Sequence, residues 1–131
     1  MYADTSPSDA KTLGSALPRM EGFARVGFEQ RDGASRLSVL DQRSPLRVLF
    51  PRAETGDLPL AAITTVSGGL VGGDTLDISV AVGGSAKAIA FGQAAEKVYR
   101  SNGPESRVDG SLNVAAEAWL EWLPQETILF D

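Results

Sequence analysis

The chain contains no cysteine and no histidine among its 131 residues. Without cysteine, it cannot form disulfides, iron–sulfur clusters, thiolate zinc sites or a cysteine nucleophile. Without histidine, it lacks the commonest metal ligand, the usual general base and any Ser-His-Asp triad. Most familiar enzyme classes are therefore excluded before any motif is considered.

Positive charge and long apolar runs are also scarce. The 12 Lys and Arg residues are outnumbered by 17 Asp and Glu residues, which gives a net charge of −5. An acidic chain of this kind is a poor match for nucleic-acid phosphates or an anionic membrane. No stretch approaches the ~20 apolar residues of a membrane-spanning helix, and the first twenty residues lack the pattern of a secretory signal. We expect a cytoplasmic protein with no nucleic-acid or membrane partner.

Composition divides the chain into an arm and one domain. Residues 1–19 are rich in Ser, Ala, Asp and Pro, which predicts a flexible N-terminal arm. Residues 20–131 hold the apolar content for one packed core. The last ten residues are strongly apolar up to Phe130, and domains seldom finish within an apolar run. Two interpretations remain open from the residues alone: a last strand docked at the domain edge, or a truncated domain.

The local patterns favour an all-β fold with few or no helices. Gly and Pro occur throughout, with 14 and 7 copies, which leaves little room for long helices. Apolar and polar residues alternate strictly from Thr75 to Val82, as in a half-buried strand. Gly83-Gly84 follows directly, and we expect it to form a hairpin turn into a strand over 86–91. The sequence predicts mainly antiparallel strands in a stacked or sandwich arrangement.

Two segments are ambiguous. Residues 112–123 fit helical spacing and strand alternation equally well, and the β-rich surroundings favour one strand. Residues 93–100 begin with helix formers and end with the β-favouring Val98 and Tyr99. No internal repeat is evident in the sequence.

A glycine-rich segment, Ser67–Asp74, is the most unusual motif. Its glycines are Gly68, Gly69, Gly72 and Gly73. Backbone N–H groups of such a loop can bind phosphate, but a nucleotide loop needs a following Lys-Ser/Thr or a helix. Neither is present, so we expect these glycines to form structural turns where backbones approach closely.

Carboxylates and one polar-aromatic segment are the remaining candidates. A carboxylate pair can hydrolyse glycosides, and carboxylates also ligate hard or borderline cations weakly. Solvated charge on exposed strands is the commoner role of such residues. In the segment 93–101, Tyr99 and Arg100 are residue types that often anchor interfaces.

The order of four segments resembles the urease accessory protein UreD family, also called UreH. They are PLRVL at 45–49, SGGLVGGD at 67–74, QAAEKVYRS at 93–101 and LEWLPQETILF at 120–130. The resemblance covers 22–131, and family members are longer, which implies an N-terminal portion. It implies an all-β, helix-like stack of strands without catalytic activity. It also implies binding to apo-urease and to UreF, which recruits the GTPase UreG, in an assembly that delivers nickel to urease.

The resemblance also marks candidate residues. Candidates for binding a partner or lining a passage are Asp74, Gln93, Lys97, Tyr99, Arg100, Glu121, Trp122, Gln125 and Glu126. Candidates for weak nickel transit are Asp74, Asp77, Glu117, Glu121 and Glu126. No tightly bound cofactor is expected, because nickel prefers nitrogen and sulfur ligands that this chain lacks.

Some features leave alternatives open. Family members commonly carry Thr-Thr before the Gln-Ala-Ala segment, whereas this chain has Phe91-Gly92. One alternative is a glycoside hydrolase that uses two of Glu117, Glu121 and Glu126, with carboxyl groups about 5–9.5 Å apart across a cleft. The other is a β interaction module of the same ancestry without an activating function.

Overall fold

A computed structural model describes residues 19–131, so the expected arm over 1–19 lies almost wholly outside the described residues. These described residues form ten strands and no helix, and the all-β expectation is confirmed. This part of the chain therefore contains no helix that is long and apolar enough to cross a membrane. The strands are β1 (Glu21–Arg31), β2 (Ala34–Arg43), β3 (Leu46–Leu49), β4 (Leu60–Thr65), β5 (Thr75–Val82), β6 (Lys87–Gly92), β7 (Glu96–Tyr99), β8 (Arg107–Val114), β9 (Trp119–Leu123) and β10 (Thr127–Phe130).

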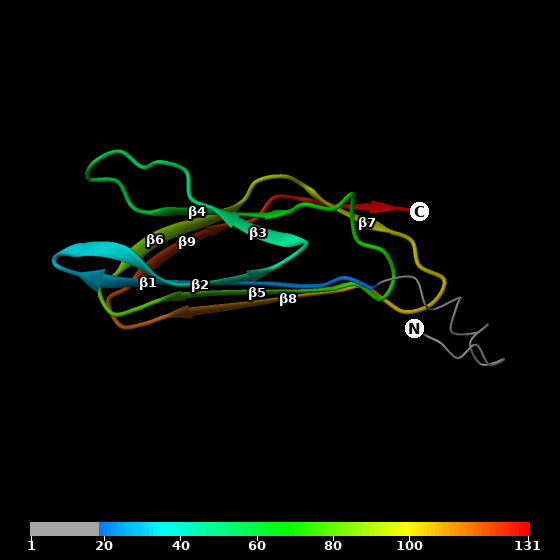
Figure 1. Ribbon diagram of the computed structural model, residues 1–131, viewed down its shortest axis with the longest axis horizontal. Helices are drawn as coiled ribbons and strands as arrows, with labels where there is room; N and C mark the ends of the chain where they lie inside the picture. The colour runs from blue at the N-terminus through cyan, green and yellow to red at the C-terminus, as the bar shows by residue number, and fades with distance from the viewer. Residues whose placement is uncertain (1–18) are drawn as a thin grey trace.

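The strands form two layers. Sheet A has the order β2-β1-β5-β8, and sheet B has the order β3-β4-β6-β9. The two sheets lie against each other as an elongated sandwich (Figure 1). Sheet C, the pair β10-β7, continues the layer of sheet B towards the end where the C-terminus lies (Figure 1).

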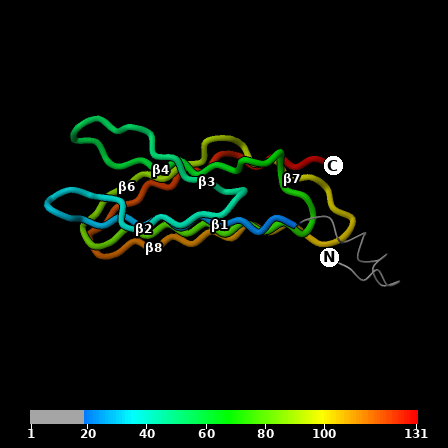
Figure 2. The backbone as a smooth tube through the Cα atoms, in the orientation of Figure 1, coloured from blue at the N-terminus to red at the C-terminus, as the bar shows by residue number. Residues whose placement is uncertain are grey.

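The chain winds through the three sheets as a coil, whose turns are visible in the backbone trace (Figure 2). One coil is β5, β6 and β7, and the next is β8, β9 and β10. Equivalent residues in these two coils are 32 positions apart in sheets A and B and 31 apart in sheet C. An earlier coil consists of β1, β4 and the bridge residue Leu70, which pairs with Val98. This arrangement agrees with the helix-like stack that the family resemblance implies.

The expectation of mainly antiparallel strands is wrong. Only β1–β2 and β3–β4 are antiparallel, and the other five pairings are parallel. The reason is that alternation of apolar and polar residues is the same in both arrangements. The turn at Gly83 is tight, since the Ala86 N–H donates to the Gly83 carbonyl oxygen (3.0 Å). It leads to the opposite layer, however, so the expected hairpin does not form.

The same turn recurs one coil later. The Ala118 N–H donates to the Ala115 carbonyl oxygen (3.1 Å), and Glu117 occupies the place of Ser85. Both residues have left-handed backbones, with φ of 60° and 62°. Residues 112–123 are therefore β-structure, but the expected single strand is wrong because a corner separates β8 from β9.

The core lies between the layers. Side chains that face inward from sheet A include Val26, Phe28, Leu76 and Val80, and they are fully buried. Sheet B contributes small residues such as Ala61, Ala88 and Ala90, which let the two layers approach closely. On the neighbouring strand β9, Leu120 pairs with Ala88 and Trp122 pairs with Ala90. Both of these β9 side chains pack against the core.

Candidate functional site

Three of the four segments that carry the family resemblance meet at sheet C. The glycine-rich segment joins β7 through Leu70, whose N–H donates to the Lys97 carbonyl oxygen (2.8 Å) and whose carbonyl oxygen accepts from the Tyr99 N–H (2.9 Å). On the other side of β7, the Glu96 N–H donates to the Glu126 carbonyl oxygen (3.0 Å). Segments about 30 residues apart in the sequence thus form one stack.

Glycine is required where the first segment meets β7. Gly69 has φ of +136°, and a Cβ there would lie 2.5 Å from the Tyr99 ring. A Cβ on Gly72 would meet the hydroxyl of Ser101 and, at 2.5 Å, the carbonyl oxygen of Pro104. These two glycines permit close approach of neighbouring coils, whereas Gly68 has open space around it.

The outer surface of sheet C carries apolar side chains, which we call the sheet C patch: Val71, Tyr99 and Phe130. The Tyr99 and Phe130 rings are stacked, with centroids 5.1 Å apart and an interplanar angle of 24°. The register of the Leu70–Val98 bridge places Val71 next to Tyr99. All three side chains are exposed. Arg100 borders the patch and pairs with Asp131 (3.5 Å) at the surface.

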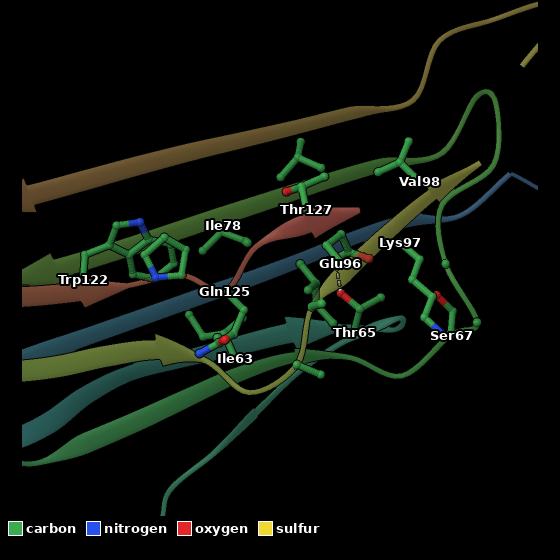
Figure 3. Close-up of a pocket in the computed structure, with 18 residues that line it drawn as sticks. Ile63, Thr65, Ser67, Ile78, Glu96, Lys97, Val98, Trp122, Gln125 and Thr127 are labelled. Atoms are coloured by element: carbon green, nitrogen blue, oxygen red, sulfur yellow. Dashed lines mark hydrogen bonds between the residues drawn. The ribbon is translucent and has the colours of Figure 1, made fainter. Parts of the chain in front are cut away.

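A cavity of about 390 Å³ lies beneath sheet C and is lined by residues from all three coils (Figure 3). Its polar lining includes Thr65, Ser67, Glu96, Gln125 and Thr127. The Thr65 hydroxyl donates to the Glu96 carboxylate (2.7 Å), an interaction drawn as a dashed line in Figure 3. The hydroxyl oxygen of Ser67 is buried and has no hydrogen-bond partner among residues 19–131.

Sequence reasoning missed Glu96, although it selected Gln93, Lys97, Tyr99 and Arg100 from the same segment. Glu96 faces the cavity because β7 alternates, and Val98, two residues later, packs against the core. That alternation was the available signal. Because the sequence left residues 93–100 ambiguous between helix and strand, it did not indicate which of their side chains point inward.

Asp74 is fully buried, and both of its carboxylate oxygens accept backbone hydrogen bonds. One accepts from the Met20 N–H (3.0 Å) and the other from the Val71 N–H (2.9 Å). The carboxylate therefore ties the start of β1 to the glycine-rich segment. Asp74 does not line the cavity beneath sheet C.

The other candidate carboxylates are scattered. Asp77 is exposed on the outer face of sheet A, and Glu117 is exposed at the corner before β9. Glu121 faces outward from sheet B, and Glu126 is exposed after the end of β9. Within residues 19–131, no three acidic side chains are grouped as a metal site. In the part of the chain that the structure describes, none of Glu117, Glu121 and Glu126 lines the cavity beneath sheet C, so this cavity does not hold the carboxylate pair that glycoside hydrolysis uses.

The remaining candidates divide between the cavity and the surface. Trp122 and Gln125 line the cavity. Lys97 is an exposed residue that borders one end of the cavity, near Ser67 (Figure 3). Gln93 is exposed in the link between β6 and β7, where its N–H donates to the Ile63 carbonyl oxygen (3.4 Å).

Comparison with known proteins identifies relatives over nearly the whole chain. The family model described as UreD urease accessory protein matches residues 20–131. A urease accessory protein UreD from Magnetococcus marinus is 49% identical over 112 residues, which are 86% of this chain and 39% of the relative. One from Rhodopseudomonas palustris is 41% identical over 131 residues, which are 100% of this chain and 46% of the relative.

A third relative, urease accessory protein UreD 1 from Brucella ovis, is 42% identical over 124 residues, covering 95% of this chain and 44% of the relative. The chain thus spans less than half the length of these curated relatives. The match nevertheless covers all three coils described above, including the glycine-rich segment and sheet C. The chain belongs to the UreD urease accessory protein family.

Proposed function

We propose that this chain is a non-catalytic scaffold for urease maturation. In this role it binds apo-urease and UreF, reaches the GTPase UreG through UreF, and supports GTP-dependent insertion of nickel into the urease active site in the cytoplasm. Its relatives are named as urease accessory proteins, and that name is the basis for the urease-related part of the proposal.

The observation that carries the scaffold role is the convergence of three distinctive segments on sheet C. They produce an exposed aromatic stack, Tyr99 on Phe130, bordered by Arg100 and its ion-pair partner Asp131. Tyr and Arg are among the residues that contribute most at protein–protein interfaces. An exposed aromatic pair of this kind favours docking of a partner protein over solvation, so we assign the sheet C patch to partner binding.

Replacing Phe130 with alanine is expected to weaken binding of UreF. Loss of a central aromatic contact costs about 2 kcal/mol, or roughly a thirty-fold increase in Kd. The measurement is affinity recovery of co-expressed UreF, followed by titration of the purified pair.

Phe50→Ala is the matched control, because Phe50 is 40% exposed and Phe130 42%, and Phe50 lies after β3, away from sheet C. UreF binding that survives Phe130→Ala unchanged, or that falls equally in both variants, would show that the partner uses another surface.

We further propose that nickel passes through the cavity as a weakly held substrate. The cavity offers one carboxylate, Glu96, together with hydroxyl and amide oxygens of Thr65, Ser67 and Gln125. Nickel binds oxygen ligands less tightly than nitrogen or sulfur ligands. Weak ligation suits transit, because a tight site would retain the ion. Glu96 replaces the scattered carboxylates as the main candidate for this step.

Glu96→Gln is expected to reduce nickel incorporation into urease several-fold at limiting nickel while leaving UreF recovery unchanged. The substitution removes the negative charge and keeps the hydrogen-bonding shape towards Thr65. Glu126→Gln is the control, since Glu126 is exposed and does not line the cavity. Equal nickel incorporation, measured by metal analysis of purified urease, would remove Glu96 from the route.

A further inference from the structure

Three steps in the sequence join an aspartate or asparagine to a following glycine, and one of them lies outside the strand ladders. Asp32-Gly33 closes the β1–β2 hairpin, and both of its residues have left-handed backbones. Asp109-Gly110 lies within β8 and pairs in register with β5. Asn102-Gly103, in contrast, lies in the link over 100–106 between β7 and β8, which belongs to no strand. Its backbone is therefore not fixed by pairing with a neighbouring strand.

An asparagine followed by glycine places an electrophile beside a nucleophile. The backbone nitrogen of Gly103 attacks the side-chain amide carbon (Cγ) of Asn102, and glycine has no Cβ to obstruct the approach. The N–Cγ bond forms, the Cγ–Nδ2 bond breaks, and the proton of the Gly103 N–H leaves with the side-chain nitrogen as ammonia. One water then opens the resulting five-membered succinimide. Opening at Cγ gives aspartate, and opening at the main-chain carbonyl carbon gives isoaspartate.

The geometry of the link leaves this reaction open at Asn102. Asn102 and Gly103 are both exposed, and a Cβ at Gly103 would have nothing within 4 Å. The Gly103 N–H donates to the Ser101 hydroxyl oxygen (3.1 Å) at the surface, where water can replace this hydrogen bond at little cost. Asn113, the other asparagine of the sequence, lies within the paired strand β8 and precedes the β-branched Val114. Both the strand ladder and the valine side chain hinder the same attack there.

The same link packs against the glycine-rich segment, where it crosses from sheet C to sheet A at one end of the sandwich (Figure 1). The Ser101 hydroxyl donates to the Pro104 carbonyl oxygen (2.6 Å) and so closes a turn. Ser101 and Pro104 lie so close to Gly72 that a Cβ there would clash with both. The Gly73 N–H donates to the Glu105 carbonyl oxygen (3.0 Å). The turn thus supports the part of the glycine-rich segment that adjoins the sheet C patch.

We propose that Asn102 is a site of spontaneous deamidation, with isoaspartate as the main product because the main-chain carbonyl carbon is the more reactive of the two. Isoaspartate inserts one methylene group into the main chain and adds a negative charge. Since the link over 100–106 contacts the glycine-rich segment on both sides of residue 102, the added length displaces the Ser101–Pro104 turn from Gly72. The modification therefore loosens the support of the sheet C patch as the protein ages. Its effect on partner binding rests on the function proposed above, whereas the modification itself does not.

Incubation of the purified chain at neutral pH and physiological temperature tests the site directly. Trypsin separates the two asparagines into the peptides 101–107 and 108–131. We expect the first peptide to gain the mass of an amide-to-carboxyl conversion and to become a substrate for an isoaspartyl methyltransferase, while Asn113 in the second peptide is retained. The same incubation in guanidinium chloride gives the rate in the unfolded chain. In the folded protein, Asn102 is expected to react within roughly tenfold of that rate, a difference in the barrier of at most about 1.4 kcal/mol.

Gly103→Ala is the matched variant, because Gly103 has no left-handed backbone and has space for a methyl group. The methyl group hinders the attacking nitrogen, so deamidation is expected to slow roughly tenfold or more while the fold is unchanged. Fresh Asn102→Asp carries the added charge without the longer main chain. Amide exchange at Gly73 is expected to accelerate several-fold in the incubated native chain, but not in incubated Gly103→Ala or in fresh Asn102→Asp.

Three results would overturn the inference: retention of Asn102 in the folded chain, equal deamidation of the native chain and Gly103→Ala, or unchanged exchange at Gly73 after conversion. Recovery of UreF is measured separately, and we expect it to fall several-fold with the incubated native chain but not with incubated Gly103→Ala. Equal recovery before and after conversion would show that the turn does not support the sheet C patch. If the fresh chain recovers no UreF, the proposed partner is wrong, whereas the peptide and exchange measurements still decide the deamidation.

Discussion

Asp74→Ala is expected to lower the free energy of unfolding by about 3 kcal/mol, because two backbone N–H groups lose a charged acceptor in a fully buried site. Hydrogen bonds to charged groups contribute about 1.5–3 kcal/mol each, and the unpaired N–H groups of Met20 and Val71 add to the cost. The measurement is urea unfolding followed by tryptophan fluorescence.

Asp77→Ala is the matched control for this substitution. Asp77 is an acidic residue three positions away, but its side chain lies on the outer face of sheet A. A surface change of this kind alters stability by no more than about 0.5 kcal/mol. If the free energies of unfolding of the two variants were similar, the connection that Asp74 makes between the start of β1 and the glycine-rich segment would not stabilise the protein. Loss of nickel binding with unchanged stability would return Asp74 to the list of metal residues.

Gly69→Ala is expected to destabilise the protein by about 2–4 kcal/mol, through two separate causes. The backbone conformation at φ +136° is strained for any residue with a side chain, at about 1–3 kcal/mol. The added methyl group would also lie 2.5 Å from the Tyr99 ring and 3.1 Å from the Lys97 carbonyl oxygen. To relieve the contact with the Lys97 carbonyl oxygen, the glycine-rich segment must move away from β7.

Gly68→Ala separates this effect from a general intolerance of the segment. Gly68 has open space around it and no left-handed backbone, so the expected change is within about 0.5 kcal/mol. Because Gly69 contacts Tyr99, the Gly69→Ala variant is also expected to bind UreF less well. Equal stability of the two variants would contradict the close approach of the first two coils at sheet C.

The local pattern was sufficient to identify strands but not their partners. The alternation over Thr75–Val82 identified β5 with the bounds that the structure shows. Parallel pairing is set by residues 32 positions away, which a local pattern does not contain. Residues 75–91 and 107–123 are the same structural unit, yet only four residues, Asp77, Ser79, Val82 and Ala86, have identical partners one repeat later. The repeat was therefore missed.

The candidate site was predictable only where sequence motifs were distinctive. The segments at 67–74, 93–101 and 120–130 are three of the four that carry the family resemblance, and the structure brings these three together at sheet C. Selection of single carboxylates by residue type was less successful. Asp74 is a buried acceptor of backbone hydrogen bonds, and Glu117 holds a corner, while Glu96 was overlooked. Burial and direction of a side chain depend on coil stacking, which residue type does not reveal.

The stacked coil also determines how stability is distributed in this protein. β1 pairs with β5, and β5 pairs with β8, so each layer is held mainly by its immediate neighbours. Such a stack behaves as a one-dimensional array, in which cooperativity passes from one repeat to the next. The middle repeat, β5 to β7, has a neighbouring repeat on both sides and should open last. The repeat β8 to β10, which contains Phe130, has a neighbouring repeat on one side among the described residues. A protein bound at Phe130 would thus stabilise the least stable repeat directly. This added stability against unfolding would reach β1 only through β5.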